Sequence, residues 1–236
     1  PISRAQEEEY FRNEDRKEIF NLLADFPHTL SLSAHTHNQW QHFFDKSEGW
    51  KQDKPHHHYN VGTTSGNWYS GELDANGVPI STMSDGTPKG YAFISFTGNN
   101  YKVNYKVAGK PESYQIEISA PKVIEQGKKT SAGIYANFFM GTADDEVMVR
   151  VDKGKWAKMT HVKEVDPAFL NLQHRWDYTD ELLSGKRPGL ANPCHHLWRA
   201  NIPHKLKAGE HTIEVKATDM YGQTHTETKT YKILER

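Results

Sequence analysis

Two histidines one residue apart are the first residues in the chain whose types and spacing could do chemistry. His35 and His37 follow the segment "TLSLSA", which alternates polar and apolar residues as a short strand does. Two neutral imidazoles at this spacing can each reach one of two neighbouring metal ions. The same spacing also fits two hydrogen-bonded loop histidines, so the residues alone leave both interpretations open.

A second histidine group follows at His56, His57 and His58, in the segment "PHHHY". In a strand, His56 and His58 would share one face, which allows a second metal site. No Cys, Asp or Glu accompanies them at ligand spacing, so we favour a polar rim that pairs beside the strand before His35. The three histidines are therefore candidates for the rim of a substrate cleft.

Large aromatic side chains near these histidines could stack on a sugar or a lipid headgroup, although aromatics at this density are more typical of a local core. The residues in question are Trp40, Trp50, Trp68 and Tyr69. Trp68 is kept as a candidate for the substrate rim.

The only cysteine, Cys194, lies in the segment "CHHLW". A Cys/His pair could supply a nucleophile and its base, but no third group that would orient them is identifiable in the sequence. One cysteine also excludes an internal disulfide. We therefore predict a free, buried thiol with a structural role.

The composition of the 236 residues limits the class of partner. Lys and Arg total 29 against 30 Asp and Glu, so the charge gives no reason to expect nucleic acid as a partner. The mean hydropathy of -0.82 and the short apolar runs exclude a membrane-spanning helix. The chain begins at Pro1 with neither an initiator Met nor a leader, so we expect a processed protein or part of a longer one.

The elements that would position the candidate residues begin with a helix over residues 3–26. Ser3 and Gln6 have the spacing of a capping box, and Pro27 ends the helix. An apolar stripe at three-and-four spacing would cover a sheet, and its residues are Phe11, Ile19, Leu22, Leu23 and Phe26. A strand over residues 29–33 then leads to His35.

The rest of the chain has the turn signals and the alternation of short strands. Asn76-Gly77 predicts a hairpin, and Asp85-Gly86 marks a further reversal of the chain. Strands are predicted over residues 91–96, 100–107, 114–119, 133–139, 146–152, 156–162, 197–202, 211–219 and 224–234. The last seven of these indicate a β-sandwich.

Gly and Pro interrupt the pattern within residues 108–113 and predict a boundary there. The two predicted domains are residues 1–107 and residues 108–236. Residues 163–196 do not alternate, and we expect them to fold over an edge of the sandwich or across the domain interface.

The segment "LSLSAHTHNQ" resembles the last metal-binding motif of the calcineurin-like metallophosphoesterases, which is usually Gly-His-x-His after a hydrophobic strand. Ala34 stands where that family usually has Gly, which permits backbone conformations that Ala resists. Residues 57–96 and 196–233 are similar to a bacterial subgroup of the family, in which a β-sandwich domain follows the phosphoesterase domain.

This resemblance implies a mainly β fold with one N-terminal α-helix, of the α+β class. Residues 1–107 would be the C-terminal portion of the family's α/β sandwich, and residues 108–236 would be an immunoglobulin-like β-sandwich. His35 and His37 would bind one metal ion each, in a centre of two divalent ions, Mn, Fe or Zn. The complete enzyme would hydrolyse phosphate esters at that centre.

The family's other metal-binding motifs are Asp-x-His, Gly-Asp and Gly-Asn-His-Asp/Glu, together with one further His. All of them precede the region that this chain resembles, and the chain contains no Asp-x-His, Gly-Asp or Asn-His sequence. On its own, the chain is therefore expected to bind metal weakly or not at all and to be inactive.

A second function class stays open, in which the sandwich is a non-catalytic binding module for a carbohydrate, a cell-surface partner or another copy of itself. An apolar stripe left uncovered on the first helix would favour a homodimer through residues 4–44, or a rearranged fold of that segment. The resemblance further implies a bacterial protein exported to the periplasm or the cell surface.

Overall fold

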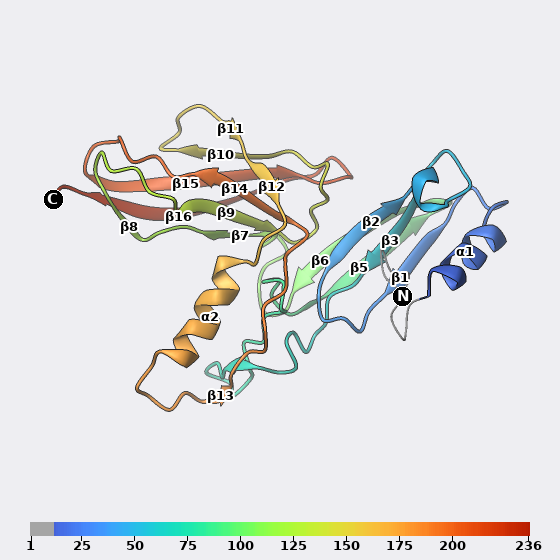
Figure 1. The fold of residues 1–236 in the computed structure, drawn as a ribbon, viewed down its shortest axis with the longest axis horizontal. Coiled ribbons are helices and arrows are strands. Elements are labelled where there is room, and N and C mark those ends of the chain that lie inside the picture. The colour runs from blue at the N-terminus through green and yellow to red at the C-terminus, as the bar shows by residue number, and fades with distance from the viewer. Residues whose placement is uncertain (1–11) are drawn as a thin grey trace.

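The structure, a computed structural model, describes residues 12–236, and strands dominate it (Figure 1). The mainly β class predicted above is confirmed. The predicted capping box of Ser3 and Gln6 and the apolar Phe11 lie outside the described residues. Within residues 12–236, no helix is both long enough and apolar enough to cross a membrane.

A small three-stranded sheet and one helix form the N-terminal part, at one end of the molecule (Figure 1). Strand β3 (His56–Asn60) lies in the middle, parallel to β1 (Leu30–Ser33) and antiparallel to β2 (Trp40–Phe44). This pairing confirms the prediction that the histidine segment lies beside the strand before His35. A short 3-10 helix, η1 (Lys46–Glu48), follows β2.

Helix α1 (Asn13–Leu22) packs on this sheet, but of the predicted apolar stripe only Leu23 packs against the buried aromatic cluster, while Ile19, Leu22 and Phe26 are exposed. Phe20, which is not in the predicted stripe, is fully buried, and its ring centroid lies 5.2 Å from those of Phe44 and Trp50. Leu22 is 70% exposed, and Phe26 lies beyond the end of the helix. Spacing selects the longest set of apolar residues, whereas packing selects the one ring that fits between two aromatic side chains.

The middle of the chain begins with a segment rich in turns. Strand β4 (Gly71–Glu72) in this segment pairs with β13 (Gly185–Lys186), which comes from a distant part of the sequence. The predicted hairpin at Asn76-Gly77 is confirmed, because the residues on the two sides of this turn pair with each other.

Strands β5 (Gly90–Thr97) and β6 (Asn100–Val107) confirm the two strands predicted over residues 91–96 and 100–107, and they pair as an antiparallel hairpin. Side chains of β6 contribute to an apolar cluster that reaches the C-terminal part of the chain. The cluster consists of Tyr59, Met83, Val103, Tyr105, Val107, Phe139 and Met140. The N-terminal and C-terminal parts therefore share buried side chains, while the division into domains at residues 108–113 stays a prediction.

Two sheets packed around one core form the C-terminal part (Figure 1). The strand orders are β11-β10-β15-β16-β8 and β12-β14-β9-β7. The strands are β7 (Ile116–Ser119), β8 (Val123–Glu125), β9 (Gly133–Phe138), β10 (Val147–Val151), β11 (Ala157–Lys158), β12 (Thr160–Val162), β14 (Leu197–Asn201), β15 (Gly209–Thr218) and β16 (Thr224–Leu234). Alternate side chains from both sheets meet in the core, among them Ile118, Trp198 and Val215.

The prediction of a single, N-terminal helix is wrong, because α2 (Pro167–Asp177) lies within residues 163–196. Asp166 caps this helix, and its side chain accepts a hydrogen bond from Ala168 N at 2.6 Å. Asp166 followed by Pro167 is a signal for the start of a helix. The lack of strand alternation in residues 163–196 predicts only the absence of a strand, so it does not reveal the helix. Arg175 of α2 forms an ion pair with Glu72 of β4, so the segment lies between the two parts of the molecule (Figure 1).

Candidate metal-binding loop

The H-T-H loop, residues 34–39, joins β1 to β2 and contains both histidines of the first candidate pair. His35 and His37 have positive φ angles of 85° and 54°. Such angles are uncommon for residues other than glycine, and they persist only where the surrounding structure holds them. The conformation of this loop therefore depends on the contacts that hold it.

The ring of His37 is fixed on two sides. Its Nδ1 lies 2.6 Å from the carbonyl oxygen of Gly66, and because a carbonyl can only accept, Nδ1 carries the proton and donates it. The ring also stacks on Trp68, with centroids 4.1 Å apart and planes 13° apart. Metal-binding histidines commonly donate their second N–H to a carbonyl in this way, which leaves the Nε2 lone pair for the metal.

The residues present fit part of a metal centre. In residues 12–236, no three His, Cys, Asp or Glu side chains come together in a group that could hold a metal ion. His35 and His37 can supply two imidazoles, and a divalent ion needs more donors than these. Further ligands would have to come from outside the described residues.

The entry of the loop is held by a row of alternating hydroxyls and imidazoles between β1 and β3, which we call the hydroxyl–imidazole ladder. It consists of Thr29, His56, Ser31, His58 and Ser33, and successive members lie 2.7 to 3.0 Å apart. Ser33 then donates to Asn60 Oδ1 at 2.7 Å, and Asn60 Nδ2 donates to Thr36 Oγ1 at 2.8 Å. Asn60 therefore connects the ladder to Thr36, the residue between the two candidate ligands.

Burial keeps the imidazoles of the ladder neutral. Burial lowers the pKa of His56 to about 4, and burial together with neighbouring histidines lowers the pKa of His58 to about 3. His57 points to the other face of the sheet, where its Nδ1 lies 2.7 Å from the hydroxyl of Tyr101 and burial lowers its pKa to about 4. All three side chains are at most 2% exposed. This burial gives no support to a rim position, and the rim role of the three histidines stays a prediction.

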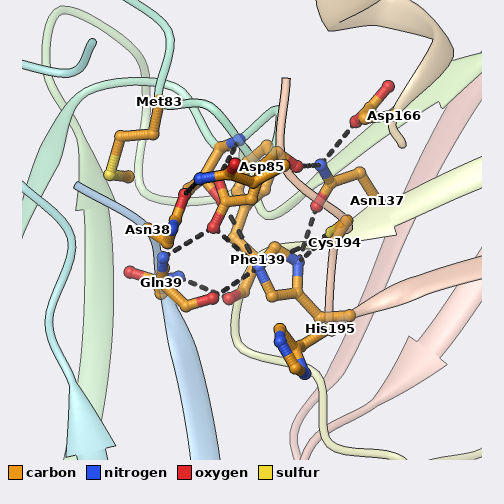
Figure 2. Close-up of polar contacts among 12 residues, drawn as sticks. Asn38, Gln39, Met83, Asp85, Asn137, Phe139, Asp166, Cys194 and His195 are labelled. Carbon is orange, nitrogen blue, oxygen red and sulfur yellow. Dashed lines mark hydrogen bonds and ion pairs between the residues drawn. The ribbon is translucent and has the colours of Figure 1, made fainter. Parts of the chain in front are cut away.

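The exit of the loop is held at Gln39, which is 1% exposed. Its backbone N–H donates to Asp85 Oδ2 at 2.6 Å, and its carbonyl oxygen lies 2.9 Å from His196 Nε2. The side-chain amide donates to the carbonyl of Phe139 and accepts from the hydroxyl of Tyr59 at 3.0 Å. Figure 2 shows Gln39 within this buried cluster, which draws on segments far apart in the sequence.

His196 carries a proton on each ring nitrogen. Asn137 Nδ2 donates to Asp166 Oδ2 at 2.5 Å, so Asn137 Oδ1 faces His196 Nδ1 at 2.8 Å as an acceptor. Nε2 faces the carbonyl of Gln39, which also only accepts. Burial lowers the pKa of His196, but the Asp85 carboxylate, 3.6 Å from Nε2, outweighs it and holds the pKa well above its ordinary value.

Cys194 has the free, buried thiol predicted from the sequence. Its Sγ lies 3.4 Å from His196 Nδ1, and Asn137 supplies the orienting group that the sequence does not reveal. This outline resembles a nucleophile with its base, but the thiol is fully buried and burial raises its pKa. A protonated, inaccessible thiol cannot attack a substrate, so its role here is structural.

The structure therefore brings His37 and Trp68 together and links His56 and His58 to the loop through Asn60. Sequence reasoning did not find Asp85 or Asn137. Asp85 lies in the reversal predicted at Asp85-Gly86, where Gly86 N donates to Met83 O at 2.9 Å. A turn signal does not show which distant backbone group a turn carboxylate will bind.

Comparison with known protein families gives a match that covers most of the chain after the H-T-H loop. Residues 58–225 match a family model described as the C terminal of calcineurin-like phosphoesterase, and this range covers well over half of the chain. The matched range begins at His58, in β3, and so follows the H-T-H loop. No curated protein matches the chain.

Proposed function

Because the chain belongs to the family of C-terminal regions of calcineurin-like phosphoesterases, we propose that it acts as the C-terminal part of a metal-dependent phosphoesterase. In this proposal residues 1–107 complete the α/β sandwich of the enzyme, and residues 108–236 form an immunoglobulin-like β-sandwich. The observation that carries the proposal is His37, whose Nδ1 proton is bound by the Gly66 carbonyl while Nε2 keeps its lone pair.

In this proposal His35 and His37 each bind one of two divalent ions, Mn, Fe or Zn. Such ions, when bound, polarise a phosphoryl oxygen and lower the pKa of a water molecule. The described residues do the positioning. The Gly66 carbonyl fixes the tautomer of His37, Trp68 fixes its ring plane, and Asn60 holds Thr36 between the two ligands.

The same proposal assigns Trp68 to substrate contact. Trp68 is 62% exposed although it stacks on His37, and the adjacent Tyr69 is 60% exposed. Both residues have positive φ angles, 54° and 52°, which persist only where the surrounding structure holds the backbone. Exposed aromatic faces beside a metal ligand suit the organic part of a phosphate ester.

The test compares this chain with the product of its complete reading frame. With added Mn²⁺, Zn²⁺ or Fe²⁺, this chain alone should not hydrolyse model phosphomonoesters or diesters above background, because it supplies too few ligands. In the complete product, His37→Ala is expected to lower kcat/KM by about 100-fold or more. His28→Ala, which removes an exposed histidine outside the loop, is the matched control and should have no effect.

Two results would contradict this proposal. Turnover by this chain alone that is lost in His35→Ala and His37→Ala would show that the metal centre is complete within it. Unchanged turnover of the complete product in His37→Ala would remove His37 from the centre.

A cleft in the C-terminal part favours the second candidate function, a binding module. The cleft lies between β10–β11 and β12–β14 and has a volume of about 510 Å³. Its lining residues include four positive charges and no negative one: Arg150, Lys155, Lys158 and Arg199. Such a lining suits an anionic ligand, for example an acidic carbohydrate. The reading-frame comparison separates the two candidates, since a binding module would act without a phosphoesterase.

A homodimer through the N-terminal segment is also part of the proposal. Helix α1 and the residues after it expose the large apolar side chains of Ile19, Leu22, Phe26 and Leu32. At about 25 cal/mol per Å², covering a few hundred Å² of apolar surface would stabilise a dimer by several kcal/mol. Sedimentation equilibrium should give a dimer for the wild type and a monomer for Leu22→Glu, with Glu18→Gln on the same helix as the control. A monomeric wild type would defeat the proposal.

The family resemblance further supports the proposal of an exported, periplasmic or cell-surface protein.

A further inference from the structure

The backbone of Gln39 obtains its hydrogen bonds from two distant side chains. The paired part of β2 begins at Trp40, which lies opposite Asn60, so the sheet does not satisfy the polar groups of Gln39. Asp85 accepts from its N–H, and His196 donates to its carbonyl oxygen. Buried backbone groups require such partners, and here both partners are charged.

Each of these two partners is fixed independently of the loop. His196 immediately precedes β14, and its own carbonyl accepts from Phe138 N at 3.0 Å, at the end of β9. Its ring is held by Asn137 of β9 at 2.8 Å. Asp85 sits in a tight turn, where its Oδ1 accepts from Thr87 N at 2.9 Å. The hydrogen bonds to Gln39 therefore connect the loop to rigid points.

We propose that two side chains distant from the loop in sequence position it: His196, next to β14 of the C-terminal part, and Asp85, in the turn-rich middle segment, hold Gln39 in place, and through it His37, at the point where a metal ion would bind. His37 is two residues from Gln39, and the carbonyl of the intervening Asn38 accepts from Asn60 at 2.7 Å. Only Asn38 separates the two residues, so the position of Gln39 limits where the backbone of His37 can lie. His196 and Asp85 are positioning residues in this scheme, and neither touches the metal.

The charges of the two side chains make the arrangement dependent on both of them. His196 is fully buried and Asp85 is 1% exposed. Each neutralises the other, so removing one charge leaves the other buried without its counterion. A variant lacking one partner should therefore loosen Gln39, whereas a variant that removes both charges buries no unpaired charge.

The part of this inference that concerns metal rests on the proposed function, while the part that concerns loop order does not. The test uses this chain with Asp85→Asn. An Asn can accept only one of the two N–H groups that the carboxylate binds, those of Gln39 and Thr87. We expect the Gln39 amide to exchange hydrogen at least ~10-fold faster, and the NMR signals of the His37 ring to shift.

The matched control is His211→Gln, which breaks a His–Asp pair that lies wholly within the C-terminal part. His211 Nδ1 lies 2.5 Å from Asp152 Oδ2, and the hydrogen bonds of both side chains stay within the C-terminal part. This control should leave the Gln39 amide and the His37 signals unchanged. If Asp85→Asn does not fold, the double variant Asp85→Asn/His196→Gln, which buries no charge, takes its place with the same expected direction of change.

Binding of Zn²⁺ alone to the product of the complete reading frame, measured by calorimetry, gives the second readout. Wild-type affinity is expected to fall about 10-fold in the Asp85 variant and to stay constant in His211→Gln. Unchanged Gln39 exchange and unchanged His37 signals would overturn the inference, whatever happens to Zn²⁺. A complete wild-type product that binds no Zn²⁺ would count against the metal part of the proposed function, and the exchange data would still decide the positioning role.

Discussion

Lowering the pH from 7 to 4 is expected to unfold the protein, because three buried histidines stay neutral in the folded chain. The pKa values of His56, His57 and His58 are lowered from 6.5 to about 4, about 4 and about 3. Below pH 6.5 the unfolded chain takes up protons at these residues and the folded chain does not. Their contribution to stability is therefore complete above pH 6.5 and is lost as the pH falls toward 4.

The size of this effect is large compared with the stability of a protein. Each histidine contributes a slope of about 1.4 kcal/mol per pH unit within its window, so three contribute about 4 kcal/mol per pH unit. From pH 6.5 to pH 4 the total loss is about 10 kcal/mol, which exhausts a free energy of unfolding in the lower half of the usual range of about 5–15 kcal/mol. Burial raises the pKa of Asp145 and Asp166 above the ordinary value of 3.8, so these two carboxyls favour the folded protein in acid. Two carboxyls offset only part of the loss that three histidines cause.

The opposite sign applies to His196, whose pKa is raised. Its contribution is complete below pH 6.5 and is lost as the pH rises through its folded pKa. Stability should therefore be greatest near neutral pH and fall in both directions.

Urea denaturation at several pH values checks these slopes. His57→Phe replaces a ring that stacks on Phe43 with centroids 4.5 Å apart, and it should reduce the acid slope by about one third. The exposed-site control His28→Gln should leave the slope unchanged. Equal free energies of unfolding at pH 7 and pH 5 would refute the account.

Gly66→Ala is expected to destabilise the protein by more than about 3 kcal/mol and to displace His37. A Cβ at this position would lie 1.6 Å from the carbonyl oxygen of Ser81, so one of the two backbones must move. Gly66 also has a positive φ of 50° and supplies the carbonyl that holds His37. The substitution should therefore weaken both the fold and the candidate site.

Gly77→Ala is the matched control for this prediction. Gly77 also has a positive φ, 74°, but a Cβ there would meet nothing within 4 Å. Its substitution should cost only the backbone strain, about 1 kcal/mol. The measurements are urea denaturation and the NMR signals of the His37 ring. Equal costs for the two substitutions, or His37 signals that do not change in Gly66→Ala, would contradict the close contact.

Local alternation predicted the strands whose pairing is also local. The hairpin of β5 and β6 and the long β16 lie almost where the sequence places them. The predicted strand over residues 156–162 instead divides into β11 and β12, which belong to different sheets. Met159 between them is 2% exposed, and a period of two cannot show that the chain changes sheet at such a point.

The residues of the candidate site also fall into two groups, those found from local sequence spacing and those that only the tertiary fold reveals. His35 and His37 were found because their spacing along the chain is itself the signal. Asp85, Asn137 and His196 come from three distant segments, and only the tertiary fold brings them to Gln39. Helix α1 shows the same limit, since the register of its buried face depends on Phe44 and Trp50, which lie elsewhere in the chain.

The hydroxyl–imidazole ladder has a direction, and Asn60 sets it. Asn60 Nδ2 donates to the carbonyl of Asn38, so Asn60 Oδ1 must be the atom that faces Ser33. Ser33 gives its only hydroxyl proton to Oδ1 and must then accept from Nε2 of His58. A neutral His58 that is protonated at Nε2 has an acceptor at Nδ1.

The remaining members follow one after another. Ser31 gives its proton to His58 Nδ1 and accepts from His56 Nε2, and His56 Nδ1 accepts from Thr29. A single amide thus fixes the tautomers of two imidazoles, and every proton in the row points toward the H-T-H loop. No member can reverse alone, so the tautomer of His56, at the far end of β1, depends on the orientation of the Asn60 amide beside the metal-binding loop.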